Sequence, residues 1–239
     1  MLEEINDNLL KQTKNIFKSW FIDFEPFGGT RPQFMKETSL EDVCDVVTKG
    51  TTPTTLKKSF TDRGINFIKA ESILDNHSFD YTKFAFIDEE TNGILKRSII
   101  EENDILFTIA GTLGRFALVN NEVLPANTNQ AIAIIRYDKK KVDPYYLYSF
   151  FIGDWHIIYY SQRIQQAVQA NLSLATIRSL PILLLDKDNM IRYTSIITPM
   201  FEKMKLVELE NKRLIELRDS LLPKLMSGEI DVSNIKLDL

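Results

Sequence analysis

The C-terminal part of the sequence carries a heptad repeat, which limits what the chain can fold into. From about residue 188 to residue 222, mostly apolar side chains recur at alternating spacings of three and four residues, including Ile197, Met200, Met204, Val207, Asn211, Leu214 and Leu221. This is the spacing of a coiled-coil seam, and charged residues fill the remaining positions. A helix of this length is about 50 Å long and cannot bury its seam against itself. The repeat therefore predicts that another helix lies along it.

A second amphipathic helix opens the chain. Apolar residues follow helical spacing from the first residue to about residue 24, and they place Leu2, Ile5, Leu9 and Ile16 on the predicted seam. Pro26 and Gly28 then end the helical pattern. The chain thus consists of a helix, a middle body and a second helix. We expect the two helices to pack antiparallel and to hold the body at one end.

Three residues interrupt the C-terminal helical pattern. A buried Asn211 would fix the register of the seam and the number of partners, and the alternative is that Asn211 lies at the solvated end of the seam. Both interpretations stay open. Pro199 would kink the helix unless the helix begins there, and Pro223, followed by Gly228, indicates a helix stop.

Composition excludes several classes of protein. The chain has 239 residues, of which 44% are hydrophobic, so it can bury a core. The single cysteine, Cys44, excludes an internal disulfide, suits a reducing cytoplasm and is interpreted as a core residue. His77 and His156 lack further ligands at metal-binding spacing, so no metal site is expected. The acidic N-terminus is no signal peptide, and no apolar run reaches membrane-spanning length. We therefore expect a cytoplasmic protein without a membrane partner.

The middle body has the pattern of a mixed α/β domain. Short β-branched or apolar runs bounded by turn residues predict strands within residues 40–47, 65–69, 104–110, 115–119, 131–136 and 180–185. Asp143 and Pro144 predict the start of an aromatic helix over 145–151, and a second helical stretch follows over 155–165. Residues 126–130 are predicted to form a polar loop. Many short strands joined by irregular loops favour a recognition surface over a deep catalytic cleft.

The sequence shows little catalytic chemistry. It contains no Walker loop, no Gly-x-Gly-x-x-Gly and no Ser-His-Asp arrangement. Residues 111–114, Gly-Thr-Leu-Gly, follow a strand without the helices of an RNA-clamping module, so an ordinary turn is the better interpretation. Residues 88–90 are interpreted as a solvated run of acidic side chains. An enzyme is therefore the weaker hypothesis.

Polar and basic side chains on the predicted loops point instead to duplex DNA. Arg and Lys read guanine edges and Asn and Gln read adenine edges, while hydroxyls and lysines hold phosphates. The candidates are Lys49, Thr51, Thr52, Lys57, Lys58, Arg63, Lys69, Thr112, Arg115, Asn127, Asn129, Gln130, Gln162, Arg163, Gln166 and Asn171. A net charge of −4 argues against non-specific coating of nucleic acid, although residues 48–72 are locally basic. Taken singly, each candidate is more often a solvated or locally bonded loop residue. The residues alone predict a recognition module with a coiled-coil spacer.

Two segments resemble a known family. Residues 9–26, LLKQTKNIFKSWFIDFEP, resemble the conserved spacer helix of specificity subunits from type I DNA restriction–modification systems, and residues 210–230 resemble the family's distal conserved helix. Similarity to the markers of a target recognition domain is looser, at KGTTP (49–53), DILFT (104–108), GTLG (111–114), NQ (129–130), NLS (171–173) and LP (180–181). The resemblance covers essentially the whole chain.

The resemblance implies a specific architecture. The expected fold is an α+β (mixed α/β) target recognition domain flanked by long α-helices that form an antiparallel coiled-coil spacer. The expected parts are the N-terminal conserved spacer helix (1–25), the target recognition domain (26–185), the C-terminal conserved coiled-coil helix (186–227) and a tail (228–239). Family members usually have two recognition domains, so this chain corresponds to half of one, most like the C-terminal half. Three alternatives stay open for the length: a natural half-subunit, a fragment, or one partner in a split or shuffled locus.

The resemblance also implies a non-catalytic function. The chain would read one half of a bipartite double-stranded DNA target. It would dock a methyltransferase subunit that holds S-adenosylmethionine and an ATP-dependent restriction subunit that uses ATP and Mg²⁺, while binding no cofactor itself. A half-length chain would form a homodimer or pair with another half-subunit. The acidic net charge predicts weak DNA affinity until the methyltransferase partner is bound. The alternatives are a coiled-coil adaptor whose middle domain binds protein or peptide and, third, a nuclease.

Overall fold

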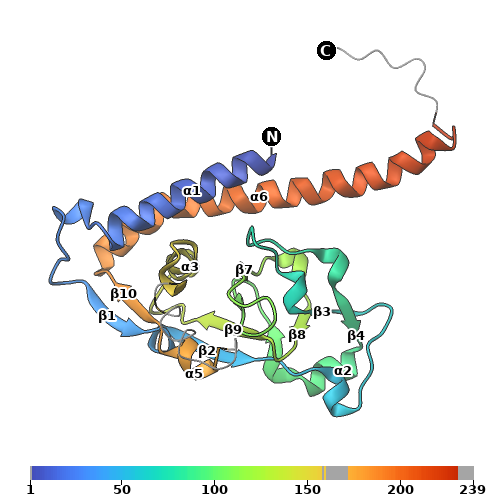
Figure 1. The fold of residues 1–239 in the computed structure, drawn as a ribbon, viewed down its shortest axis with the longest axis horizontal. Helices are drawn as coiled ribbons and strands as arrows, with labels where there is room; N and C mark the ends of the chain where they lie inside the picture. The colour runs from blue at the N-terminus through green and yellow to red at the C-terminus, as the bar shows by residue number, and fades with distance from the viewer. Residues whose placement is uncertain (1, 158, 160–171, 231–239) are drawn as a thin grey trace, which may run out of the picture.

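Two antiparallel helices lie along one side of a body of short strands (Figure 1). The computed structural model describes residues 2–157, 159 and 172–230. The helices are α1 (Leu2–Phe21) and α6 (Lys187–Met226), and the strands and shorter helices between them form the body. The predicted order of helix, mixed α/β body and helix is confirmed.

The interface between α1 and α6 is largely aromatic. Thr13 of α1 lies opposite Met200 of α6, with 3.9 Å between the hydroxyl oxygen and the sulfur atom. The buried side chains of the two helices include Phe17, Trp20 and Phe21 on α1 and Tyr193, Ile197, Phe201 and Val207 on α6. The ring of Tyr193 lies about 5 Å from the rings of both Trp20 and Phe21. Packing of large apolar side chains therefore fixes the two helices against each other.

The seam on α1 differs from the prediction. Ile5 is exposed, Leu9 and Ile16 are only half-buried, and the side chain of Leu2 lies outside the described part of the structure. The buried stripe runs instead through Thr13, and the Thr13 hydroxyl donates a 2.9 Å hydrogen bond to the carbonyl of Leu9. Because that bond satisfies the hydroxyl within the helix, a polar residue occupies a fully buried position.

The seam on α6 is covered over only part of its length. Ile197 and Val207 are buried, Met200, Met204 and Asn211 are half-buried, and Leu214 and Leu221 are exposed. Because the two helices are antiparallel, their register can be followed from the contact between Thr13 and Met200. Counting eleven residues back along α1 and eleven residues forward along α6 places Leu2 opposite Asn211. Asn211 thus lies where α1 begins. The predicted positions Leu214 and Leu221 are not buried in a single chain, because α1 does not reach them.

The predicted helix stop is correct at Gly228 and wrong at Pro223. Helix α6 continues through both Pro199 and Pro223 and ends at Met226, ahead of Gly228, which has a φ of 73°. A proline removes only its own backbone donor, and a long helix tolerates that loss where the neighbouring turns remain bonded. The helix end is set by the left-handed glycine.

In the described part of the chain, the strands form two sheets and one separate pair. One sheet has the order β2 (Cys44–Lys49), β9 (Ile132–Tyr137), β6 (Ile105–Thr108) and β7 (Phe116–Leu118). The other has the order β4 (Ala85–Ile87), β3 (Ile65–Ile68), β8 (Ala126–Thr128) and β5 (Ile99–Ile100). Strands β1 (Lys36–Ser39) and β10 (Pro181–Leu184) pair antiparallel close to the start of α6.

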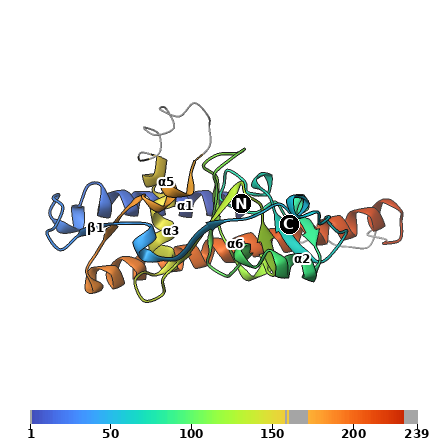
Figure 2. The ribbon, with the colours of Figure 1, turned by 90° about the horizontal axis from the view of Figure 1, so that it is seen from below.

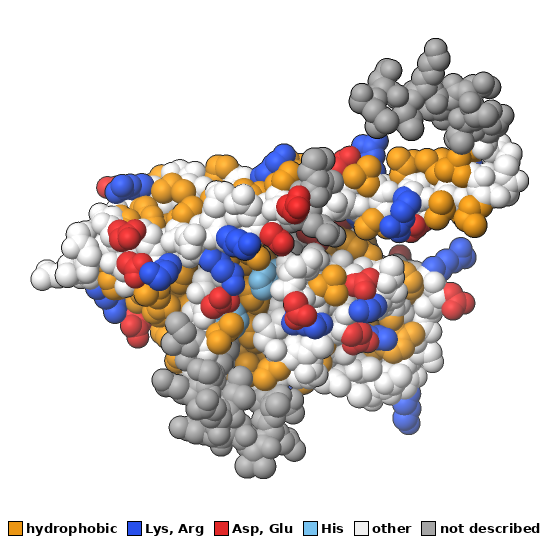
Figure 3. Space-filling model, turned by 45° about the horizontal axis from the view of Figure 1, so that its top comes forward, with side chains coloured by type: hydrophobic (Ala, Val, Ile, Leu, Met, Phe, Trp, Pro, Cys, Tyr) orange, Lys and Arg blue, Asp and Glu red, His pale blue; other side chains and the backbone are white. Residues whose placement is uncertain are grey.

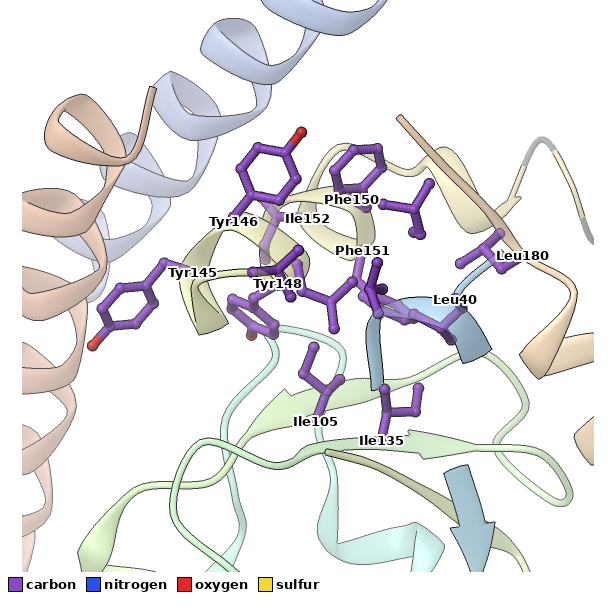
Figure 4. Packing of buried hydrophobic residues seen from close by; sticks show 14 of the residues in the cluster. Leu40, Ile105, Ile135, Tyr145, Tyr146, Tyr148, Phe150, Phe151, Ile152 and Leu180 are labelled. Carbon is purple, nitrogen blue, oxygen red and sulfur yellow. The ribbon is translucent and has the colours of Figure 1, made fainter. Parts of the chain in front are cut away.

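Both faces of the first sheet are buried. Ile105 and Ile135 point toward helix α3 (Pro144–Ile152), whose aromatic side chains fill the space between this sheet and the helix pair (Figure 4). Leu106 and Ile134 point the other way, into a second apolar cluster shared with Ile68 of the other sheet. Burial on both faces explains why β6 and β9 consist of continuous apolar runs rather than alternating ones.

Helix α3 begins as predicted. The Asp143 carboxylate accepts hydrogen bonds from the backbone N–H groups of Tyr145 and Tyr146, at 2.8 and 3.2 Å, and Pro144 occupies the first turn. The same kind of cap starts α2 (Glu89–Ile94), where Asp88 accepts from the N–H of Thr91. The acidic run at 88–90, interpreted as a solvated loop, is solvated as expected, since all three residues are exposed, but it starts a helix rather than lying in a loop. Helix α5 (Leu174–Arg178) lies next to β2, because the Arg178 guanidinium donates a 2.8 Å hydrogen bond to the Val47 carbonyl.

The segment predicted as a polar loop is partly wrong. Residues 126–128 form β8, which pairs parallel with β3 and antiparallel with β5, and all three are buried. Its two polar side chains meet their hydrogen-bonding needs inside the body. The Asn127 side-chain N–H donates to Asn92 Oδ1 and to the Leu95 carbonyl, and the Thr128 hydroxyl donates to the Ile68 carbonyl. Such partners are distant in sequence, so the local pattern could not indicate a strand.

Charged contacts also attach the body directly to α6. Lys205 pairs with Glu102 at 3.5 Å, and Lys212 pairs with Glu122 at 3.2 Å. The Lys212 ammonium also lies 4.4 Å from the centre of the Tyr81 ring. Helix α6 runs the length of the body and extends past it (Figure 2). The orientation of the body is therefore tied to the helix at two places in addition to its core.

Candidate nucleic-acid interface

Four segments that are far apart in the sequence meet at one edge of the two sheets. We call residues 49–52, 69–70, 111–112 and 129–130 the loop edge. Strand β3 runs parallel to β8, so the ends of these two strands, at Lys69 and Asn129, lie together. Strand β2 ends at Lys49, opposite the start of β9. The edge thus gathers segments from both sheets.

Backbone and side-chain hydrogen bonds join these segments to one another. The Thr51 N–H donates a 3.2 Å hydrogen bond to the Thr128 carbonyl, and Thr52 bonds Gln130 through its hydroxyl. The Thr112 hydroxyl donates a 3.1 Å bond to the Ala70 carbonyl. The loops therefore form one connected surface rather than independent flexible turns.

Gly50 permits the closest of these approaches. A Cβ atom at this position would lie 1.9 Å from the carbonyl oxygen of Thr128 and 2.6 Å from that of Asn129. Both obstacles are backbone atoms, so they cannot rotate away as a side chain could. The glycine of the Lys-Gly-Thr-Thr-Pro segment is therefore required for the join between the two sheets at the loop edge.

The loop edge is locally basic although the chain is acidic. Lys49 is exposed, and the Lys69 ammonium lies 5.2 Å from the centre of the Phe60 ring and 4.0 Å from the Glu71 carboxylate. Lys57, also exposed, follows the short turn η3 (Pro53–Leu56) that leaves the edge. Lysine side chains on such a surface can neutralise phosphates of a nucleic acid.

Several predicted contact residues lie at or beside this edge. They are Lys49, Thr51, Thr52, Lys57, Lys69, Thr112, Asn129 and Gln130. Gln130 is exposed and is held by Thr52, and the Asn129 side chain accepts a 3.0 Å hydrogen bond from the Ala131 N–H. The structure gathers these residues on one surface, and their contact with DNA stays a prediction.

Asn127 must be removed from the set of base-contacting residues. Its side chain is fully buried, and the partners described above use its amide within the body. Arg115 is also engaged, because its guanidinium forms two hydrogen bonds, of 2.6 and 2.8 Å, with the Asp75 carboxylate and a third with the Ile73 carbonyl. Arg115 therefore ties two loops together in this conformation.

Two further candidates are placed differently. Lys58 lies in the same turn as Lys57, since its N–H donates a 3.1 Å hydrogen bond to the Pro53 carbonyl, but its ammonium is engaged by another segment. Lys58 pairs with Glu90 at 2.6 Å, and this hydrogen bond raises the pKa of the Lys58 ammonium. Arg63 is exposed at the start of β3, which is the opposite end of that strand from Lys69. Gln162, Arg163, Gln166 and Asn171 lie outside the described residues. The chain is described again from Leu172, whose N–H donates a 3.0 Å hydrogen bond to the Ile109 carbonyl next to the loop edge.

Sequence reasoning missed the exposed turn beside the edge. Thr54, Thr55 and Leu56 are exposed there, between Pro53, which is buried, and Lys57. The Gly-Thr-Thr-Pro turn signal was the only local indication, and it does not reveal which side chains project.

The described residues offer neither a metal centre nor a membrane span. In this part of the chain, no three His, Cys, Asp or Glu side chains are grouped so that they could hold a metal ion. Among the described helices, none combines the length and apolar character needed to cross a membrane.

Comparison with known proteins assigns a family. Residues 32–217 match the family model described as the type I restriction modification DNA specificity domain. The MjaIX specificity subunit of Methanocaldococcus jannaschii is 24% identical over 241 residues, covering 96% of this chain and 55% of the relative. The HindI specificity subunit of Haemophilus influenzae is 28% identical over 209 residues, covering 83% of this chain and 42% of the relative. The chain therefore spans about half the length of the curated relatives it matches.

Solved structures show the same fold. The S subunit of a type I restriction–modification system from M. genitalium aligns with a TM-score of 0.62 at 16% identity, covering 94% of this chain and 55% of that one. The HsdS subunit from Thermoanaerobacter tengcongensis aligns with a TM-score of 0.55 at 14% identity, covering 96% of this chain and 53% of that subunit. The fold predicted from the sequence, a mixed domain with a coiled-coil spacer, is thereby confirmed.

Proposed function

The chain belongs to the family of type I restriction modification DNA specificity domains, and we propose that it reads one half of a bipartite duplex DNA target for a type I restriction–modification complex. Its relatives are specificity subunits, which are non-catalytic, so the expectation that the chain is not an enzyme is confirmed. The loop edge carries the proposal, because it joins basic and hydrogen-bonding side chains of both sheets into one surface.

We further propose that two copies of the chain, or this chain and another half-subunit, pair through the uncovered part of α6. This part exposes a row of large apolar side chains, namely Leu214, Ile215, Leu217, Leu221, Leu222, Leu225 and Met226. Figure 3 shows hydrophobic side chains along the portion of α6 that extends past the body. Contiguous exposed apolar surface of this kind marks an interaction site. A homodimer with a twofold axis would read a palindromic split site.

The partners follow from the family as proposals. The helix pair would dock a methyltransferase subunit that binds S-adenosylmethionine and an ATP-dependent restriction subunit that uses ATP and Mg²⁺. This chain would choose the site in the cytoplasm, and its partners would methylate or cut the DNA.

Duplex affinity measured against salt concentration tests the proposal. Each phosphate contact that a lysine makes releases counterions, so the logarithm of affinity falls linearly with the logarithm of salt concentration, with a slope of about −0.9 per contact. Lys49→Ala should make that slope shallower by about one, and Lys203→Ala, on the exposed face of α6, should leave it unchanged.

The two alternatives predict other results. A coiled-coil adaptor would bind a protein or peptide and show no salt-dependent duplex affinity, with or without the methyltransferase subunit. A nuclease would cleave duplex DNA in the presence of a divalent metal ion. The proposed recognition subunit should bind DNA without cutting it.

A further inference from the structure

The turn beside the loop edge presents one apolar side chain at its tip. Thr54, Thr55, Leu56 and Lys57 are all exposed there, and Leu56 is 44% exposed. A single exposed leucine is ordinary on a protein surface. Its meaning depends on how firmly it is held and on what surrounds it.

Hydrogen bonds hold the tip in one conformation. The Thr55 N–H and hydroxyl both donate to the Thr52 carbonyl, at 3.1 and 2.6 Å. The Lys57 N–H donates to the Thr54 carbonyl at 3.1 Å, and the Lys58 N–H donates to the Pro53 carbonyl at 3.1 Å. Lys57 has a φ of 57°, which turns the chain back sharply. The tip is therefore a preformed turn that requires little ordering when a ligand binds.

The base of the turn is fixed to the loop edge. Pro53 is buried, Thr52 bonds Gln130, and Gly50 lies against the Thr128 carbonyl. These contacts place Leu56 beside the hydrogen-bonding and basic groups of the edge. It does not lie on a detached loop.

Exposed lysines lie beside Leu56 and can hold an anionic partner. Lys57 is its direct neighbour in the chain, and Lys49 lies at the base of the same turn. Ile94 makes an informative contrast: it is 49% exposed, but it ends α2, whose first turn carries Glu89 and Glu90. Glu90 also lies close to the Leu56 turn, where it forms a 2.6 Å ion pair with Lys58. The exposed cations beside Leu56 are therefore those of Lys57 and Lys49, and Ile94 has no lysine as its direct neighbour in the chain.

We propose that Leu56 contacts the C5 methyl group of a thymine in the major groove and thereby determines one position of the half-site. The thymine methyl is the apolar group that base pairs display on their major-groove edges, so it is the complementary partner for an aliphatic tip. Lys57 holds an adjacent phosphate and contributes affinity without sequence preference. The inference rests on the proposed function, because it assumes that the loop edge faces DNA.

The test uses the full chain with its methyltransferase subunit and a duplex carrying the motif selected from a randomised pool. Each thymine of the half-site is replaced in turn by deoxyuridine, which lacks only the methyl group. For the wild-type chain, one replacement should weaken binding about fourfold, the effect expected for one buried methyl group. For Leu56→Ala, the same replacement should have no effect. Ile94→Ala serves as the matched control and should behave like the wild type.

The outcomes separate this inference from the function on which it rests. If the wild type selects a split motif but Leu56→Ala keeps the same sensitivity to every deoxyuridine, the thymine contact is wrong and the recognition function stands. A selected half-site without any methyl-sensitive thymine leads to the same conclusion. If the wild type selects no motif while its methyltransferase partner is bound, the thymine contact and the recognition function are both contradicted. The proposal is supported if Leu56→Ala, unlike the wild type and Ile94→Ala, loses its sensitivity to deoxyuridine at a single position of the half-site.

Discussion

Gly50 and Thr128 join the two sheets at the loop edge through a contact that leaves no room for a Cβ atom, which would lie 1.9 Å from the Thr128 carbonyl oxygen. Thr51, the next residue, donates its backbone N–H to the same oxygen. The first strand of one sheet and the central strand of the other thereby meet at a fixed separation. The position of the candidate DNA-reading loops depends on this contact.

Replacing Gly50 by alanine should damage both stability and DNA binding. The backbone must shift to admit the methyl group, and overpacking of this kind costs about 1–3 kcal/mol. Denaturant unfolding and duplex affinity should both show the loss. Gly93 is the control, because a Cβ there meets nothing within 4 Å and the residue lies in α2. Gly93→Ala should be neutral or stabilise by up to about 1 kcal/mol; equal behaviour of the two variants would contradict the assigned role of Gly50.

A buried ion pair at the sheet should be sensitive to loss of its cation. The Arg136 guanidinium donates two hydrogen bonds, of 2.8 and 2.7 Å, to Asp104, whose side chain is completely buried. Burial raises the pKa of Asp104 despite the adjacent guanidinium. Arg136→Met leaves that carboxyl without its counter-charge and should cost about 3–5 kcal/mol of unfolding free energy.

Arg97 provides the comparison for this substitution, because it is exposed. Arg97→Met should change the unfolding free energy by less than about 0.5 kcal/mol. Chemical denaturation at neutral pH measures both variants. Similar small effects from the two would mean that the Arg136–Asp104 pair contributes little to the fold.

Two histidines, the half-buried His77 and the buried His156, should make the protein unstable in mild acid. His77 stacks on Phe116 with 4.0 Å between ring centres, and His156 meets the same ring edge-on at 5.3 Å. Burial lowers the pKa of each imidazole from 6.5 to about 4. Below pH 6.5 the unfolded chain takes up protons that the folded chain does not, so stability falls until about pH 4.

His156→Phe should reduce this acid sensitivity. One histidine with such a shift accounts for roughly 2–3 kcal/mol of stability lost between neutral pH and pH 4. The unfolding free energy of the variant, measured across this range, should therefore fall less steeply than that of the wild type. Phe151→Leu, in the same cluster, should lower stability by a similar amount at every pH. An unchanged pH slope in His156→Phe would exclude the histidine as the cause.

The apolar end of α6 should control association. The wild-type chain should sediment as a dimer of 27.6 kDa subunits at micromolar concentration. Introducing lysine at both Leu214 and Leu221 should yield monomers with an unchanged circular dichroism spectrum, because both side chains are exposed in the single chain. Ile94→Lys should leave the dimer intact. A wild-type chain that is already monomeric would contradict homodimerisation. Pairing with another half-subunit would then be the remaining proposal for this surface.

Local signals predict the long elements of the fold. The heptads of α6, the Asp143–Pro144 start of α3 and the apolar runs of β6 and β9 each indicate the correct element, because each is encoded within a few neighbouring residues. The local sequence of β8 indicates a loop instead, because its polar side chains are satisfied by partners far away in the sequence, as the Asn127–Asn92 hydrogen bond shows. The predicted α1 seam is misplaced, because the buried Thr13 hydroxyl bonds within its own helix.

The candidate site could be predicted only as a set of loops. The sequence identifies Lys49, Thr51 and Gln130 as polar loop residues, but their meeting at one edge follows from the pairing of strands that are distant in sequence. It also gives no sign that Asn127 is buried or that Leu56 projects, because both depend on how the loop edge is packed.

Selection of bound duplexes from a randomised pool tests the DNA-reading role of this chain most directly. The purified chain is used alone and then together with the methyltransferase subunit of its locus, and the bound DNA is sequenced. We predict enrichment of a split motif with a fixed gap, with symmetric halves if the chain forms a homodimer. No enrichment in either condition, with the methyltransferase subunit shown to be bound, would contradict the assignment of this chain as a DNA-reading subunit.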